Sequence, residues 1–102
     1  MKGCNKKLFS KNITMPQLHL ILHGKVQGVG LRIASQMKAQ TLNLTGFARN
    51  LNSDSVEILA SGDRKNLEKF LSWIKQLAST KIKSIEEEWK KKGKNFFKFN
   101  VF

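Results

Sequence analysis

The order in which two hydrophobic periodicities follow each other along the chain constrains its fold most. Leu18, Leu20 and Leu22 alternate with other residues, and a period of two is typical of a β-strand. Residues 31–42 then run without Gly or Pro and are rich in Gln, Met, Lys and Ala, which favour a helix. Asn43 follows as a residue that tolerates the left-handed conformation and is expected to end this helix.

The second half of the chain predicts two strands, a helix and two further strands. Residues 44–51 predict a second strand, residues 52–55 a hairpin turn, and the alternation of residues 56–60 a third strand. A second helix is indicated by apolar residues at helical spacing, namely Leu67, Phe70, Leu71, Ile74 and Leu77, with Asp63 placed to cap it. Residues 82–89 predict a fourth strand, residues 90–94 a turn, and Phe97, Phe99 and Val101 a fifth strand.

These elements predict an α+β fold of the ferredoxin-like type. The order is β-α-β-β-α-β plus a short C-terminal strand, which is a split β-α-β sandwich. We expect an antiparallel sheet with two helices on one face. A chain of 102 residues fits one domain. Residues 1–15 are polar, basic and aperiodic and predict a flexible tail, so the domain is expected over residues 16–102.

Composition limits the function classes. The net charge of +12 attracts phosphates, nucleic acids and anionic small molecules alike. No apolar run is long enough to span a bilayer, so no membrane partner is expected. The single cysteine, Cys4, cannot form an intrachain disulfide, and a cytoplasmic location is therefore expected. His19 and His23 lie on one face of the first strand and are predicted to be surface residues, not metal ligands or bases.

A glycine-rich segment, residues 24–30, joins the first strand to the first helix. Successive N–H groups in such a loop can form an anion-binding nest, and the helix that follows adds its positive dipole end. Arg32 stands in the first turn of that helix, where a cation is unfavourable unless an anion accompanies it. The segment fits neither the Walker pattern nor the dinucleotide fingerprint, whose third glycine position is occupied by Ile33. It therefore predicts a phosphate-like ligand.

Two blocks of this sequence resemble the acylphosphatase family. Gly24-Lys25-Val26-Gln27-Gly28-Val29-Gly30-Leu31-Arg32 is similar to the family signature Gly-Arg-Val-Gln-Gly-Val-x-Phe-Arg, and Leu44-Thr45-Gly46-Phe47-Ala48-Arg49-Asn50 is similar to Gly-Trp-Val-x-Asn. The likeness covers roughly residues 17–102. It implies the same split β-α-β fold and hydrolysis of acyl phosphates to a carboxylate and inorganic phosphate, which is then both product and inhibitor.

The resemblance also implies the site residues. Arg32 would hold the phosphoryl oxygens together with main-chain N–H groups of the loop, namely those of Gln27, Gly28, Val29, Gly30, Leu31 and Arg32. Asn50 would orient the attacking water. A carboxylate leaving group, with a conjugate-acid pKa of about 4, needs no general acid. We expect no metal and no cofactor, because Arg32 can neutralise the phosphoryl charge.

Two alternatives share this fold. One is a basic nucleic-acid-binding module, which would expose several aromatic residues on its central strands. Phe47 is the only aromatic residue of the second and third predicted strands, so a nucleic acid is not the expected partner. The other is a non-catalytic domain that binds a phosphoanion. The expected partner is a small-molecule acyl phosphate, and the expected state is a monomer.

Overall fold

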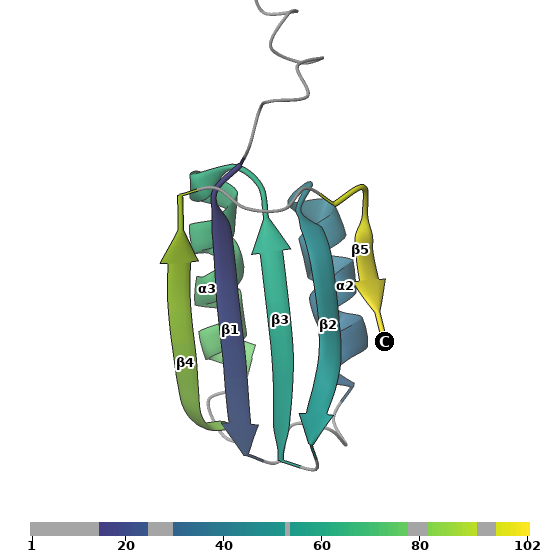
Figure 1. Cartoon of the computed structure of the whole chain (residues 1–102), viewed down its shortest axis with the longest axis vertical. Coiled ribbons are helices and arrows are strands. Elements are labelled where there is room, and N and C mark those ends of the chain that lie inside the picture. Colours follow the sequence, from purple (N-terminus) through teal and green to yellow (C-terminus); the bar gives the residue numbers. More distant parts are fainter. Residues whose placement is uncertain (1–14, 25–29, 53, 78–81, 92–95) are drawn as a thin grey trace, which may run out of the picture.

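The computed structural model describes residues 15–24, 30–52, 54–77, 82–91 and 96–102. Two helices cover one face of a five-stranded sheet with the strand order β4-β1-β3-β2-β5 (Figure 1). In chain order the elements are β1 (Gln17–Gly24), α2 (Leu31–Thr41), β2 (Thr45–Asn52), β3 (Ser55–Ser61), α3 (Arg64–Leu77), β4 (Ile82–Lys90) and β5 (Phe99–Val101). The predicted α+β sandwich is therefore confirmed.

The sheet is mixed. The prediction of an antiparallel sheet is therefore wrong for one strand, β5. The pairs β1–β3, β1–β4 and β2–β3 are antiparallel, as expected, whereas β5 pairs with β2 in parallel. The reason is topological. β4 ends at the end of the sheet where β2 begins, so the last strand runs along the free edge of β2 in the same direction as β2 (Figure 1).

The core lies between the sheet and the two helices. The alternating leucines of β1 point into it, and α3 contributes the residues of its predicted apolar stripe except the last. Leu77, at the end of α3, is 46% exposed. The weaker stripe of α2 is also buried, through Leu31, Ser35 and Ala39. Phe99 of β5 packs against Phe70 of α3 with ring centroids 6.3 Å apart, so the short last strand closes the core.

Two predicted boundaries can be compared directly with the structure. Asn43 has φ 57°, so it ends the first helix in the left-handed conformation, as predicted. Phe97 is fully exposed and precedes β5, which begins only at Phe99. The predicted tail, apart from Met15, and most of the predicted turn at residues 90–94 lie outside the described residues.

Gly46 is required by the close approach of β2 to β3. Its φ is +138°, and a Cβ atom there would lie 1.8 Å from the main-chain oxygen of Leu59. We expect Gly46→Ala to lower the free energy of unfolding by about 3 kcal/mol, because strain and a main-chain clash add. Gly30→Ala is the matched control, since its φ is +70° but no atom lies within 4 Å of the added Cβ. Urea unfolding of both variants measures the two free energies of unfolding. Equal losses of stability in the two variants would show that the clash with Leu59 does not add to the backbone strain.

Candidate active site

The start of α2 carries positive potential. Gly30 occupies the N-cap position with φ 70° and ψ 22°, and within the part of the chain that the structure describes no side-chain hydrogen bond caps this helix. The first turn contains no acidic residue, while Arg32 stands in it. Leu31 is buried and anchors the turn to the core. Gln27, Gly28 and Val29, the other predicted phosphate-binding residues, lie outside the described residues.

Arg32 is tied to the strand that carries Asn50. Its Nη1 donates a hydrogen bond to the main-chain oxygen of Phe102 at 2.5 Å. The main-chain N–H of Phe102 donates to the carbonyl of Ala48 at 3.0 Å, two residues before Asn50 in β2. A guanidinium has five N–H donors, so this contact leaves donors for a phosphoryl group.

Asn50 lies near the end of β2, at the end of the sheet where β1 ends and α2 begins (Figure 1). It pairs with Val56 of β3. Since side chains alternate along a strand, Asn50 is on the same face as buried Ala48, which is the helix-covered face. Asn50 itself is exposed. The structure therefore brings Arg32 and Asn50 to the same end of the sandwich.

The hairpin after Asn50 joins the two sequence blocks. The β2–β3 register shifts between Asn50 and Asn52, which indicates a bulge. The Asn52 Oδ1 accepts hydrogen bonds from the Asp54 main-chain N–H at 2.9 Å and from the Ser55 hydroxyl at 3.0 Å. The carbonyl of Asp54 in turn accepts from the N–H of Gly24 at 2.8 Å. The residue at which the glycine-rich segment begins is thus held by the turn that follows Asn50.

The opposite face of the sheet carries a cluster that the sequence interpretation missed. The carboxylate of Glu57 in β3 is 2.6 Å from the His19 Nε2 in β1 and 2.6 Å from the Arg49 Nε in β2. His23 pairs with Glu86 of β4 at 2.7 Å. Both histidines are therefore surface residues of β1, as predicted. The cluster spans three strands, so only the register of the sheet could have revealed it.

Glu57 is more acidic than an ordinary glutamate. Burial raises its pKa, but the hydrogen bonds from His19 and Arg49, together with their charges, outweigh burial and lower the pKa on balance. A carboxylate with a lowered pKa stabilises the fold above its unfolded pKa, and this contribution is lost as the pH falls through the folded value. The cluster therefore stabilises the sheet at neutral pH.

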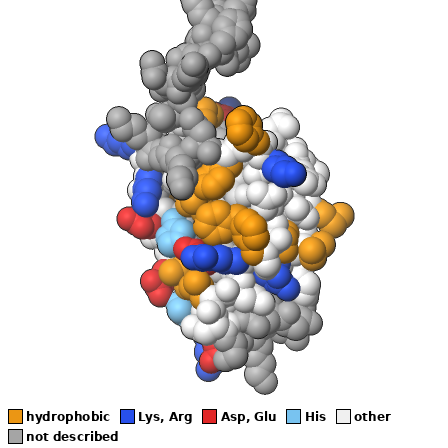
Figure 2. Space-filling view, turned by 45° about the vertical axis from the view of Figure 1, so that its right-hand side comes forward, with side chains coloured by type: hydrophobic (Ala, Val, Ile, Leu, Met, Phe, Trp, Pro, Cys, Tyr) orange, Lys and Arg blue, Asp and Glu red, His pale blue; other side chains and the backbone are white. Residues whose placement is uncertain are grey.

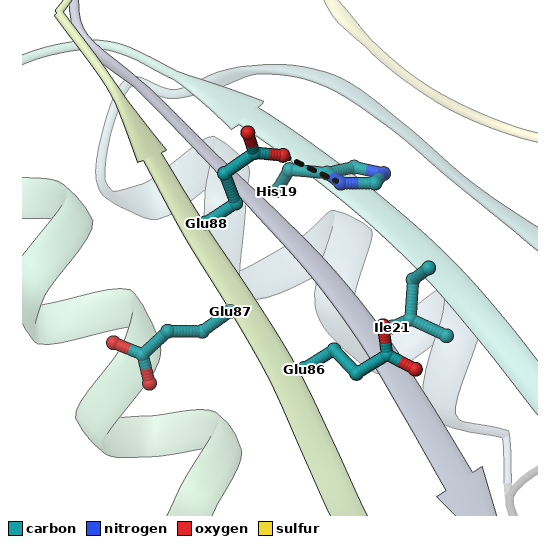
Figure 3. A pocket seen from close by; sticks show the side chains of 5 residues that line it. All are labelled: His19, Ile21, Glu86, Glu87 and Glu88. Atoms are coloured by element: carbon teal, nitrogen blue, oxygen red, sulfur yellow. Dashed lines mark ion pairs between the residues drawn. The ribbon is translucent and has the colours of Figure 1, made fainter.

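A shallow pocket of about 190 Å³ lies beside this cluster, over β1 and β4. Figure 3 shows its lining residues, which are His19, Ile21, Glu86, Glu87 and Glu88. Figure 2 shows histidine and acidic side chains along one side of a hydrophobic patch on the surface in view. The pocket is on the face opposite Asn50, so it is not part of the candidate site. Among the described residues, no group of His, Cys, Asp or Glu side chains is arranged to hold a metal ion.

None of the helices in the described ranges has the length and apolar character needed to cross a membrane.

Comparisons with known proteins identify the same fold and the same family. An acylphosphatase of Caldanaerobacter subterraneus subsp. tengcongensis is 36% identical over 86 residues, which is 83% of this chain and 96% of that protein. The crystal structure of acylphosphatase from Bacillus subtilis matches with a TM-score of 0.79 and 30% identity, covering 86% of this chain and 99% of that chain. An acylphosphatase structure from Coxiella burnetii, with a TM-score of 0.76 and 24% identity, covers 99% of this chain and 100% of that chain and supports the fold.

The family model of the acylphosphatases matches residues 18–101, from β1 to the end of β5. This range contains the start of α2 with Arg32, the end of β2 with Asn50, and the β2–β3 hairpin that contacts Gly24. The family match and the 36% identity over most of the chain show that this protein belongs to the acylphosphatase family.

Proposed function

We propose that Arg32 and the main-chain N–H groups of residues 27–32 hold the phosphoryl group of an acyl phosphate, and that Asn50 positions the attacking water. The reaction is that of an acylphosphatase, hydrolysis of the carboxyl–phosphate bond to a carboxylate and inorganic phosphate. The proposal assigns this chemistry to the end of the sandwich where α2 begins.

The observation that supports this proposal most directly is the positive charge at the start of α2. Arg32 stands in a first turn that has no acidic residue and, among the described residues, no side-chain cap. The helix dipole adds roughly half a positive elementary charge at the same place. A phosphoryl dianion would be stabilised there by the guanidinium in bidentate fashion and by the N–H groups of the turn.

The same groups serve the transition state. Phosphoryl transfer depends mainly on positioning and on stabilising charge on the transferring oxygens, so preorganised donors supply most of the acceleration. Arg32 is held by its bond to Phe102, which is in turn bonded to β2. The guanidinium is therefore set in place before the substrate arrives.

Asn50 suits the water-positioning role because its side chain amide both donates and accepts hydrogen bonds. Its neighbour Arg49 and the carboxylate of Glu57 are on the opposite face and do not reach the same water. A strong base is not required for this reaction, and the carboxylate product leaves without protonation. This chemistry favours acyl phosphates over phosphate monoesters, whose alkoxide leaving group needs a proton.

Arg32 neutralises phosphoryl charge, so we expect hydrolysis without a metal ion or cofactor. We expect a cytoplasmic monomer whose product, inorganic phosphate, also inhibits. The enzyme domain would comprise residues 16–102, and the basic segment 1–15 would contribute little to turnover.

Inorganic phosphate tests the site directly. At about ten times its Kd, phosphate should stabilise the native protein by about 1.4 kcal/mol, because it binds only the folded state. For a domain of this size the Tm should rise by roughly 7 °C. Competitive inhibition of acyl-phosphate hydrolysis and backbone NMR shifts at residues 24–32 should accompany the rise. Potassium chloride at equal ionic strength is the control. Shifts confined to the lysine-rich ends of the chain would argue against the site.

A further inference from the structure

We propose that Glu57 is a positioning residue for Asn50, acting through Arg49 to hold the end of β2 in register. This inference rests on the proposed role of Asn50. It concerns a side chain on the opposite face of the sheet, which contacts neither substrate nor water in the site.

The carboxylate of Glu57 joins three strands. One oxygen accepts from the Arg49 Nε of β2 at 2.6 Å, and the other lies 2.6 Å from the His19 Nε2 of β1. The Glu57 side chain is only 14% exposed, so its ion pair with Arg49 is less screened than an ordinary surface pair. Arg49 is also held from a second side, because its guanidinium lies 5.6 Å from the ring centroid of Phe47.

The Arg49–Glu57 ion pair lies directly before the register shift in β2. Arg49 pairs with Glu57, the next residue pair is Asn50 with Val56, and the register then shifts before Asn52. A bulge disrupts the ladder locally and bends its strand, so hydrogen bonds beyond Asn50 restrain it less than a regular ladder would. The Arg49–Glu57 pair fixes β2 immediately before this irregularity.

The effect on catalysis follows from covalent connection. Arg49 and Asn50 are neighbours in sequence, so a shift in the main chain at Arg49 moves the Asn50 side chain on the other face. Displacement of a reacting group by about 1 Å can lower a rate about 100-fold, and a smaller displacement lowers the rate by a smaller factor. Phosphate affinity would change little, because Arg32 reaches β2 only indirectly, through Phe102, whose N–H bonds to the carbonyl of Ala48 before the register shift.

The test is Glu57→Gln, which keeps the shape of the side chain and removes its charge. We expect kcat for acyl-phosphate hydrolysis to fall about ten-fold, with the Kd of inorganic phosphate within about two-fold of wild type. Arg49→Gln should have the same effect, and Arg49→Lys, which keeps a cation opposite Glu57, should retain more activity. The Arg49 side chain is 51% exposed, so its variants carry the test if Glu57→Gln does not fold.

Glu88→Gln is the matched control. Glu88 lies 3.9 Å from His19 on the same face, is 63% exposed, and should leave kcat unchanged. In NMR spectra, the side-chain amide signals of Asn50 should shift in Glu57→Gln and should not shift in Glu88→Gln. If Glu57 only stabilised the fold, its replacement would not shift these signals. In an Asn50→Ala background, Glu57→Gln should cause no further loss.

The outcomes separate the two proposals. Wild-type kcat in both Glu57→Gln and Arg49→Gln, while Asn50→Ala is impaired, would overturn the positioning role and leave the proposed function intact. A loss from Glu57→Gln that persists in the Asn50→Ala background would also overturn it. Unchanged kcat in Asn50→Ala alone would remove the assigned role of Asn50 and the positioning role with it.

Discussion

Replacing Asn50 by alanine is expected to lower kcat for acyl-phosphate hydrolysis at least about 100-fold, the usual effect of removing a polar group that acts in the transition state. The Kd of inorganic phosphate should stay within about two-fold of wild type, because the phosphate is held by Arg32 and the start of α2. An interaction made mainly in the transition state lowers kcat without a matching change in binding. Steady-state kinetics and calorimetry of the same preparation measure both quantities.

Asn100→Ala is the control for this variant. Asn100 lies in β5, opposite Phe47 of β2, and the same substitution there should leave both kcat and phosphate affinity unchanged. Asn50 is exposed, so its alanine variant should unfold at nearly the wild-type urea concentration. Near-normal kcat in a folded Asn50→Ala protein would mean that another group positions the water.

Replacing Arg32 by alanine is expected to weaken phosphate binding and to lower kcat/KM by about 1,000-fold, the lower end of the range for an arginine that stabilises a transferring phosphoryl group. Both quantities fall because the guanidinium contacts the phosphoryl oxygens in the ground state and in the transition state. Arg32→Lys should restore little, since an ammonium cannot reproduce the bidentate fork.

The control for the loss of charge is Arg64→Ala. Arg64 lies at the start of α3, where its guanidinium stacks 3.9 Å from the ring centroid of Trp89 and pairs with Glu68. Removing it changes the net charge by the same amount as Arg32→Ala but should leave catalysis unchanged. Equal losses from both variants would show that the general positive field of the protein, and not Arg32, binds the substrate.

Much of the fold could be predicted because each element carries its own pattern. The leucines of β1 and the apolar stripe of α3 report local periodicity, and Asn43 marks a local backbone conformation, so residues close in sequence were sufficient. The parallel pairing of β5 could not be predicted in this way. It depends on which edge of the finished sheet is free when the chain returns, and this is a property of the whole topology.

The candidate site also has a part that could be predicted from the sequence and a part that could not. Arg32 and Asn50 were predictable from two sequence blocks, and the structure places both at one end of the sandwich. The contacts of Glu57 with His19 and Arg49 join residues 38 and 8 positions apart in sequence. No periodicity encodes such contacts, because they follow from the β1–β3 and β2–β3 registers, which exist only in the folded sheet.

The proposed roles of Arg32 and Asn50 are tested most directly by comparing phosphate binding and acyl-phosphate turnover, in the presence of a chelator, for wild type, Asn50→Ala and Arg32→Ala. We expect that the wild type binds phosphate and hydrolyses acyl phosphate with chelator present, that Asn50→Ala binds phosphate but has lost turnover, and that Arg32→Ala is impaired in both. Parallel losses of binding and turnover in Asn50→Ala, or full phosphate affinity in Arg32→Ala, would contradict the division of roles between the two residues.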